Sequence, residues 1–176
     1  EIYTLSLHDA LPICQVIART GAHALILRAH EAGAAVVASF HDFNETPPDD
    51  TLAALYAQMA EAGADILKVA CRVNTSEDAL RVLAAQIGAH REHRRPIIGI
   101  GMGEAGAITR IAGSPLFSAA TFASLGASSA PGQFTVEETR SGLDLAEKGR
   151  KVERGKAGEK GKTTEEEKTA DKARGR

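Results

Sequence analysis

Features that would place this protein in a membrane or on an export route are missing from the sequence. No apolar run approaches the ~18 residues that a membrane-spanning helix needs. The first residues contain neither a basic start nor a small-residue cleavage site, so we expect no signal peptide. The two cysteines, Cys14 and Cys71, lie far apart and form no metal-ligand pattern. We therefore expect a cytoplasmic protein without a metal centre.

Lysine is nearly absent from the first 147 residues, which contain nine arginines and a single lysine, Lys68. It lies in the middle of ADILKVACR (64–72), a segment whose other residues mostly suit a buried strand. A lysine at a strand end commonly extends its ammonium group to water, which gives one interpretation. The other is a desolvated amine whose lowered pKa makes it a nucleophile. The lysine alone does not decide between them.

The net charge of −2 hides two regions of opposite charge. Residues 1–146 contain ten basic and sixteen acidic residues, whereas residues 147–176 contain eleven basic and seven acidic ones. An acidic body argues against a core that binds nucleic acid. Residues 150–176 have almost no large apolar side chains, so we predict a disordered charged tail. The opening segment, 1–14, resembles a translated sequencing adapter, and we expect it to be non-native.

The middle of the chain alternates between predicted strands and predicted helices. Strands are expected at 36–43, 64–72 and 95–103, with a candidate fourth strand at 114–124. Helical patterns fall at 20–33, 47–63, 76–90, 104–113 and 135–149, the last beginning with a capping box of Thr135 and Glu138. This alternation predicts βαβ units, a parallel sheet and an α/β fold.

A histidine accompanies the lysine at the predicted edge of the sheet. The segment HDF (41–43) ends the strand that precedes the one with Lys68, and His41 and Lys68 are 27 residues apart. Both lie in the carboxyl half of their strands, where α/β folds build active sites. A lone histidine there is more often structural. Together, an amine can form an imine with a ketone while an imidazole moves protons. We expect Asp42 to face the opposite side and to be structural.

The segment GIGMGEAG (99–106) contains the pattern GxGxxG as Gly101, Gly103 and Gly106. Following a strand and opening a helix, it keeps dinucleotide binding open as an alternative. The dinucleotide fingerprint also needs an acidic residue about twenty positions later, and no acidic residue occurs between Glu104 and Glu137. The other interpretation is a tight turn that brings the backbone close to a small ligand.

Two further polar features follow this turn. Arg110, in AITRIAG, is either a surface charge or a bidentate partner for a carboxylate. The loop SSAPGQ (128–133) offers hydroxyls and an amide that suit a substrate hydroxyl or carboxylate, although an ordinary turn before a helix would look the same. Neither feature identifies a ligand by itself.

The segments HDF, ADILKVA, GMGEAGAITRIAG, SAATFA and SAPGQ occur in this order between about residue 20 and about residue 145. Taken together, they resemble type I 3-dehydroquinate dehydratase. The resemblance implies an eight-stranded β/α barrel and conversion of 3-dehydroquinate to 3-dehydroshikimate in the shikimate pathway, through a lysine imine without a metal or nucleotide cofactor. Because the HDF strand comes so early, the domain at 15–149 resembles the carboxyl-terminal half of such a barrel, about strands five to eight.

The resemblance also implies roles for individual residues. By it, Lys68 forms the Schiff base, His41 is the general acid–base, and Arg110 grips the substrate carboxylate. It also implies that Ser129 and Gln133 make polar contacts with the substrate. Met102 and Phe122 match positions that line the pocket. It further implies a small-molecule substrate, no nucleic-acid or membrane partner, and a homodimer of the complete protein. The alternatives are another Schiff-base lyase, such as a class I aldolase-like barrel, and a non-catalytic nucleotide-binding module.

Overall fold

The structure is a computed structural model that describes residues 13–17, 22–111, 113–125 and 132–148. Most of the expected non-native segment 1–14, the charged tail 150–176 and Ser129 lie outside the described residues. Within the described part, no helix is both long enough and apolar enough to cross a membrane.

Strands and helices alternate along the chain, as the sequence predicted. The elements are β1 (Ile13–Ile17), α1 (Ala22–Glu31), β2 (Ala35–Asp42), α2 (Asp49–Glu61), β3 (Ile66–Arg72), α3 (Ser76–His93), β4 (Ile97–Met102), α4 (Ile108–Ile111) and a 3-10 turn (Ser114–Leu116). A further helix covers residues 136–148.

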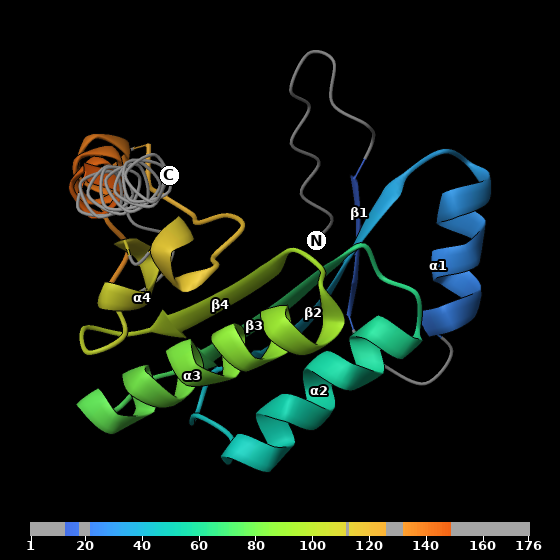
Figure 1. Ribbon diagram of the computed structural model, residues 1–176, viewed down its shortest axis with the longest axis horizontal. Coiled ribbons are helices and arrows are strands. Elements are labelled where there is room, and N and C mark those ends of the chain that lie inside the picture. Colours follow the sequence, from blue (N-terminus) through green and yellow to red (C-terminus); the bar gives the residue numbers. More distant parts are fainter. Residues whose placement is uncertain (1–12, 18–21, 112, 126–131, 149–176) are drawn as a thin grey trace, which may run out of the picture.

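The four strands form one parallel sheet in the order β1-β2-β3-β4. Helices α1, α2 and α3 lie along one side of this sheet (Figure 1). A doubly wound sheet reverses its strand order at a switch point and has helices on both faces, whereas a β/α barrel adds each strand beside the last. The sequential order and one-sided helices confirm the α/β class and an incomplete β/α barrel.

Three elements differ from the sequence prediction. The helix expected at 104–113 is shorter, because residues 104–107 form turns and α4 covers only Ile108–Ile111. β1 precedes α1, and no strand was expected there. The expected strand at 114–124 is wrong in extent, because this segment contains a 3-10 turn and only the isolated bridges Ile97↔Ser118 and Ser124↔Thr135. The backbone explains the difference: Phe117 has a φ of 62°, which interrupts an extended path.

The residues of the sheet alternate between two environments, as the pleat of a strand requires. One face packs beneath the helices and supplies the main core, which includes Val36, Ala38, Leu67, Val69 and Ile97 with Leu52, Tyr56, Met59 and Val82 from the helices. The other face carries a smaller apolar cluster of Ala70, Ile98, Ile100 and Met102. We call this second surface the inner face, because it corresponds to a barrel interior.

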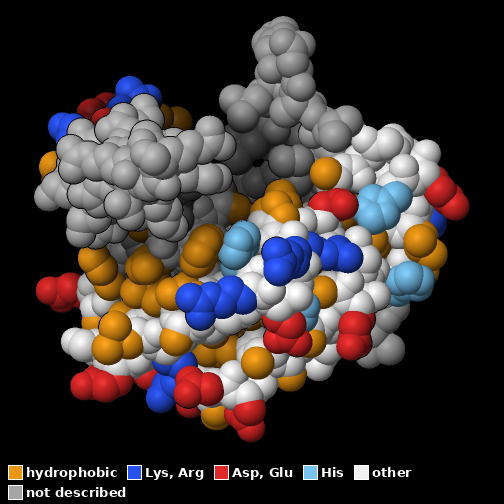
Figure 2. Space-filling view, in the orientation of Figure 1, with side chains coloured by type: hydrophobic (Ala, Val, Ile, Leu, Met, Phe, Trp, Pro, Cys, Tyr) orange, Lys and Arg blue, Asp and Glu red, His pale blue; other side chains and the backbone are white. Residues whose placement is uncertain are grey.

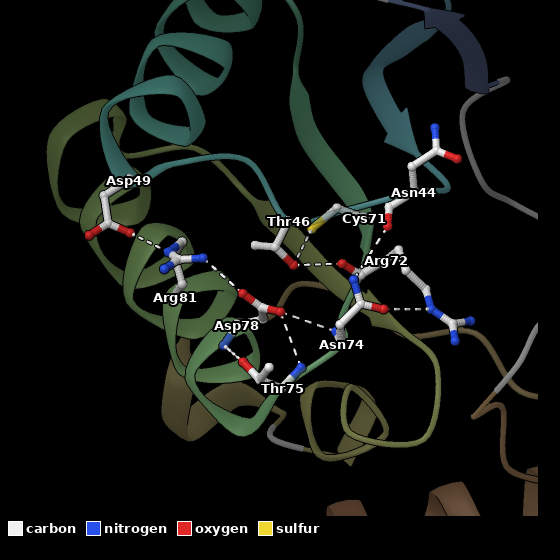
Figure 3. Close-up of polar contacts among 9 residues, drawn as sticks. All are labelled: Asn44, Thr46, Asp49, Cys71, Arg72, Asn74, Thr75, Asp78 and Arg81. Carbon is white, nitrogen blue, oxygen red and sulfur yellow. Dashed lines mark hydrogen bonds and ion pairs between the residues drawn. The ribbon is translucent and has the colours of Figure 1, made fainter.

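Caps and side-chain bonds fix the loops at the carboxyl end of the sheet. The N-cap of α3 is Thr75, which forms a capping box with Asp78. Arg81 then pairs with both Asp78, at 2.8 Å, and Asp49, at 3.1 Å, and so ties α3 to the start of α2 (Figure 3). The predicted capping box of the last helix is confirmed, since the Thr135 hydroxyl accepts a bond from the Glu138 backbone N–H.

The loops after β2 and β3 are also bonded directly to each other. The Thr46 hydroxyl donates to the backbone oxygen of Arg72 at 2.6 Å, and the Asn74 amide donates to the backbone oxygen of Asn44 at 3.3 Å (Figure 3). The carboxyl ends of β2 and β3 are therefore held at a fixed spacing.

Arginine and histidine side chains lie close together on the face shown in Figure 2, with acidic side chains nearby. The last turn of α3 contains three residues of basic type, His90, Arg91 and His93. Positive charge is favoured at the carboxyl end of a helix, so Arg91 suits its place in the last turn of α3. The C-cap of the helix is Arg94, whose φ is 54°.

Candidate active site

Lys68 lies on the inner face of the sheet, in the middle of β3. Its register partners are Ser39 on β2 and Ile98 on β4. The side chain is only 9% exposed, in contrast to the extended, hydrated lysine that a strand end would give. Of the two interpretations that the sequence left open, burial of Lys68 is the one that the structure supports.

The surroundings of Lys68 favour the neutral amine. Burial lowers its pKa from the ordinary lysine value, and the nearby positive charge of Arg110 lowers the pKa further. Among the described residues Lys68 forms no ion pair that would oppose these effects. Its ammonium nitrogen instead lies 4.5 Å from the centroid of the Phe122 ring. A fraction of Lys68 is therefore uncharged and nucleophilic at a lower pH than an exposed lysine would be.

His41 lies on the same inner face as Lys68, one strand away. Its register partner on β3 is Ala70, two residues nearer the carboxyl end than Lys68. Burial lowers the pKa of the imidazole, and the charge of Lys68 lowers it further. Both effects favour the neutral ring, which can accept a proton.

Asp42 has the structural role that the sequence predicted. Its carboxylate accepts bonds from the backbone N–H groups of Asn44, at 2.8 Å, and Glu45, at 3.2 Å. It therefore fixes the turn that follows His41.

Arg110 lies in the short helix α4 and is only 3% exposed. Burial lowers the pKa of its guanidinium, yet its buried Nε has no hydrogen-bond partner within the described structure. A buried, incompletely bonded cation is unfavourable unless an anion completes it. Arg110 is therefore a fitting carboxylate-binding group.

The turn between β4 and α4 is closed by Thr109, a residue that sequence reasoning missed. Its hydroxyl donates to the Gly106 oxygen at 2.7 Å and accepts from the Gly101 N–H at 2.9 Å. Thr109 is 1% exposed and directly precedes Arg110. The available signal was a hydroxyl residue within the apolar stretch AITRIAG.

The glycines of GIGMGEAG serve the folding of this turn. A Cβ placed on Gly101 would lie 2.9 Å from the Cα of Gly106, so the two backbones are in contact. Gly103 has a φ of 102°, and its oxygen contacts Gly132, which lies in the loop that was predicted to bind substrate. A dinucleotide fingerprint uses such glycines to admit a pyrophosphate at the start of a long helix, whereas α4 has four residues. The geometry therefore favours the tight-turn interpretation.

The remaining predicted residues occupy different parts of the structure. Met102 ends β4 on the inner face and is 7% exposed, and Phe122 lies over Lys68. Gln133 is half-buried and directly follows Gly132. Ser129 lies outside the described residues. Nothing in the described part of the chain groups three His, Cys, Asp or Glu side chains around a possible metal position.

Ser39 is a second residue that the sequence reasoning missed. It is fully buried and is paired in register with Lys68. The signal was its position two residues before His41, which places both residues on the same face of β2. Ser39, His41 and Lys68 thus line one continuous strip of the inner face.

The arrangement combines three groups that together suit a reaction of a keto acid, a molecule that carries both a ketone and a carboxylate. A partly neutral amine can attack a ketone, and a neutral imidazole can then take a proton from the neighbouring carbon. A buried guanidinium can orient a carboxylate on the same molecule.

Comparisons with known proteins give a consistent result. A family model described as type I 3-dehydroquinase matches residues 17–150. A 3-dehydroquinate dehydratase of Neisseria gonorrhoeae (strain NCCP11945) is 36% identical over 143 residues, which cover 81% of this chain and 56% of that protein. A 3-dehydroquinate dehydratase of Aromatoleum aromaticum is 35% identical over 164 residues, which cover 85% of this chain and 63% of that protein. The chain spans about half the length of the curated relatives it matches.

Solved structures of similar proteins agree with these relatives. The crystal structure of 3-dehydroquinate dehydratase from Geobacillus kaustophilus HTA426 has a TM-score of 0.74 and 37% identity, covering 77% of this chain and 54% of that one. The structure of a type I 3-dehydroquinate dehydratase from Clostridium difficile has a TM-score of 0.73 and 33% identity. The match covers 78% of this chain and 56% of that one.

Proposed function

Because the chain belongs to the type I 3-dehydroquinase family, we propose that the complete protein dehydrates 3-dehydroquinate to 3-dehydroshikimate. This hydro-lyase reaction belongs to the shikimate pathway, which leads to chorismate and the aromatic amino acids. The chain supplies the part of the barrel that carries Lys68 and His41. The observation that carries the proposal is the buried Lys68, whose pKa is lowered and which lies on the inner face beside His41.

In the first step the neutral amine of Lys68 attacks the ketone carbon of the substrate. The hydroxyl of the resulting carbinolamine takes up a proton from the surrounding water and leaves as water, and the nitrogen becomes part of a positively charged iminium. The lowered pKa of Lys68 supports this role, because only the unprotonated amine is a nucleophile. Arginine at this position would remain protonated and could not form the imine.

In the second step the iminium acts as the electron sink. His41 removes a proton from the carbon next to the iminium, and the electron pair forms an enamine. The enamine then expels the neighbouring hydroxyl group, which leaves as water after His41 returns the proton to it. Hydrolysis of the remaining imine frees the product and Lys68. The lowered pKa of His41 supports its part as the base.

The other site residues orient the substrate in this scheme. Arg110 binds the carboxylate through the guanidinium that is left incompletely bonded. Ser129 and Gln133 contribute polar contacts, and Met102 and Phe122 shape the pocket. The scheme needs no metal or nucleotide, because the lysine imine itself supplies the electron sink.

Two other functions were open from the sequence. A non-catalytic nucleotide-binding module is less well supported, because Gly101 and Gly106 contact each other. A different Schiff-base lyase uses the same lysine chemistry, and a screen of other ketone substrates with borohydride separates it from the proposed reaction.

We further propose a cytoplasmic location and a homodimer of the complete protein, with no nucleic-acid or membrane partner. The small-molecule substrate is the only partner that the site chemistry requires. Size-exclusion chromatography with light scattering tests the dimer, and it is run on the chain completed with the amino-terminal half of a relative.

Trapping of the imine with borohydride tests the central proposal. The chain is incubated with 3-dehydroquinate and borohydride, and its peptides are analysed by mass spectrometry. The same experiment is run on a version completed with the amino-terminal half of a relative, and on both proteins carrying Lys68→Arg. We expect an adduct on Lys68 that the substitution abolishes. No adduct in a completed protein that is folded would contradict the proposal.

A further inference from the structure

The ring of Phe122 faces the nitrogen of Lys68 directly. The distance from the ammonium nitrogen to the ring centroid is 4.5 Å, which is within the range of a cation–π interaction. Phe122 belongs to the segment after β4, which reaches back over the sheet to β3. Phe122 itself is 36% exposed, whereas Lys68 is 9% exposed. The ring is thus partly exposed while the lysine nitrogen that lies over it is buried.

Phe122 favours the charged form of Lys68, because the lysine nitrogen lies over the face of its ring. His41 on β2 and Arg110 on α4 are the titratable or charged groups facing it, and neither is an anion. Ile98, its partner on β4, is apolar. Burial and the Arg110 charge both disfavour the ammonium. The negative face of an aromatic ring attracts a cation, so Phe122 acts in the opposite direction.

We propose that Phe122 is a positioning residue that holds the cationic forms of Lys68, the resting ammonium and the reaction iminium, against its ring. The part that concerns the iminium rests on the proposed function. The same nitrogen is involved in both states: it loses a proton, bonds to the ketone carbon, and regains positive charge when water leaves. One ring can therefore stabilise the charge before and after imine formation.

This interaction has a different consequence from simple lining of a pocket. An aliphatic side chain of similar size would exclude water equally well but would leave the cation without an attractive surface. The ring thus lets a buried lysine remain in place while it is charged, and the neutral amine is released from the ring when it attacks.

A chemical labelling experiment on the chain tests this role without requiring turnover. Lys68 is acylated with a limiting N-hydroxysuccinimide ester over a range of pH, and labelling is quantified by peptide mass spectrometry. The measured quantity is the ratio of the labelling rate at pH 7 to the plateau rate at high pH. Greater access to Lys68 raises both rates equally, whereas a weaker hold on the ammonium raises only the first.

Two variants and one control make the test specific. Phe122→Leu removes the ring, and replacement of Phe122 by a ring-trifluorinated phenylalanine keeps its shape while weakening the negative face. Phe117→Leu is the control, because Phe117 is similarly exposed at 39% but stacks on His90. We expect the ratio to rise about two- to five-fold in Phe122→Leu, to rise less in the fluorinated variant, and to stay constant in Phe117→Leu.

The outcomes separate this inference from the proposed function. An unchanged ratio in the fluorinated protein would overturn the inference, even if Phe122→Leu fails to fold. A raised ratio together with less trapped 3-dehydroquinate adduct supports a role for Phe122 in holding both the ammonium and the iminium form of Lys68. A raised ratio in a completed protein that traps no adduct at all would support the hold on the ammonium and count against the dehydratase function.

Discussion

His41 and Lys68 occupy neighbouring strands of one face, with His41 two register positions nearer the carboxyl end of the sheet. Each is buried enough for its pKa to be lowered, and the charge of Lys68 lowers the pKa of His41 further. The two groups therefore disfavour simultaneous protonation. A lysine that acts as a nucleophile and a histidine that acts as a base both need to be neutral at the start of the reaction.

Removal of the buried amine should stabilise the chain. In Lys68→Met the cost of burying an ammonium disappears, so we expect the free energy of unfolding at pH 7 to rise by about 1–3 kcal/mol. Because the folded pKa of Lys68 is below its unfolded pKa, the unfolded state binds more protons between these two values. The stability of the parent chain should therefore rise with pH through this window, and the advantage of the variant should shrink. Urea unfolding at a series of pH values measures both effects.

Loss of the base should separate imine formation from dehydration. In a completed barrel, His41→Asn should lower turnover of 3-dehydroquinate by about 10²–10⁴-fold. The borohydride adduct on Lys68 should persist, because the amine is still present. Turnover is followed by product absorbance and the adduct by mass spectrometry. Equal loss of turnover and adduct would show that His41 serves imine formation or folding instead.

The hydroxyl of Thr109 should contribute measurably to stability. Thr109→Val removes the acceptor of the buried Gly101 N–H, whereas the Gly106 oxygen keeps the bond from the backbone N–H of residue 109. We expect a loss of about 1–3 kcal/mol in urea unfolding. Thr139→Val is the matched control, because Thr139 is also buried but its hydroxyl has no hydrogen-bond partner in the described structure. The control should be neutral or slightly stabilising, and similar losses in both variants would argue against the bridging role.

A methyl group should be tolerated at one glycine and not at another. In Gly106→Ala the new Cβ would collide with the backbone of Gly101, so we expect destabilisation of at least about 1–3 kcal/mol. Gly88 lies within α3, and a Cβ added there would meet no atom within 4 Å, so Gly88→Ala should stabilise the chain by about 0.5–1 kcal/mol. Thermal unfolding of the two variants compares them directly. A Gly106→Ala protein as stable as the parent would show that the turn is looser than described.

The isolated chain should associate with itself and show little activity. Its four-stranded sheet ends at β1, which pairs only with β2 among the described strands. Unpaired strand edges favour pairing with other chains. Size-exclusion chromatography with light scattering should detect species larger than a monomer, increasing with concentration. A sharp monomeric peak with cooperative unfolding would contradict this prediction.

Local sequence patterns predicted the elements near the site well. The apolar run around Lys68 is a local property of one strand, and the capping box of Thr135 and Glu138 is a local property of one helix. These features depend on neighbouring residues in the chain, which is why the order of strands and helices could be read from sequence. The strand alone did not decide whether Lys68 is buried or hydrated.

Contacts between distant segments could not be predicted in the same way. The positive φ of Phe117 prevents a continuous strand at 114–124, although its residues are strand-like. The contact between Phe122 and Lys68, and the burial of Ser39 beside that lysine, depend on how separate segments meet. The family resemblance implied that Phe122 lines a pocket but did not indicate which group its ring would face.

The order of the strands has a consequence for how such a site can be inherited or transplanted. His41 and Lys68 lie on consecutive strands joined by a single helix, so residues 35–72 contain both groups and the helix that spaces them. Their separation is set within this one segment. Exchange of the remaining strands, by recombination or by design, would change what surrounds the substrate while leaving the distance between base and nucleophile unaltered.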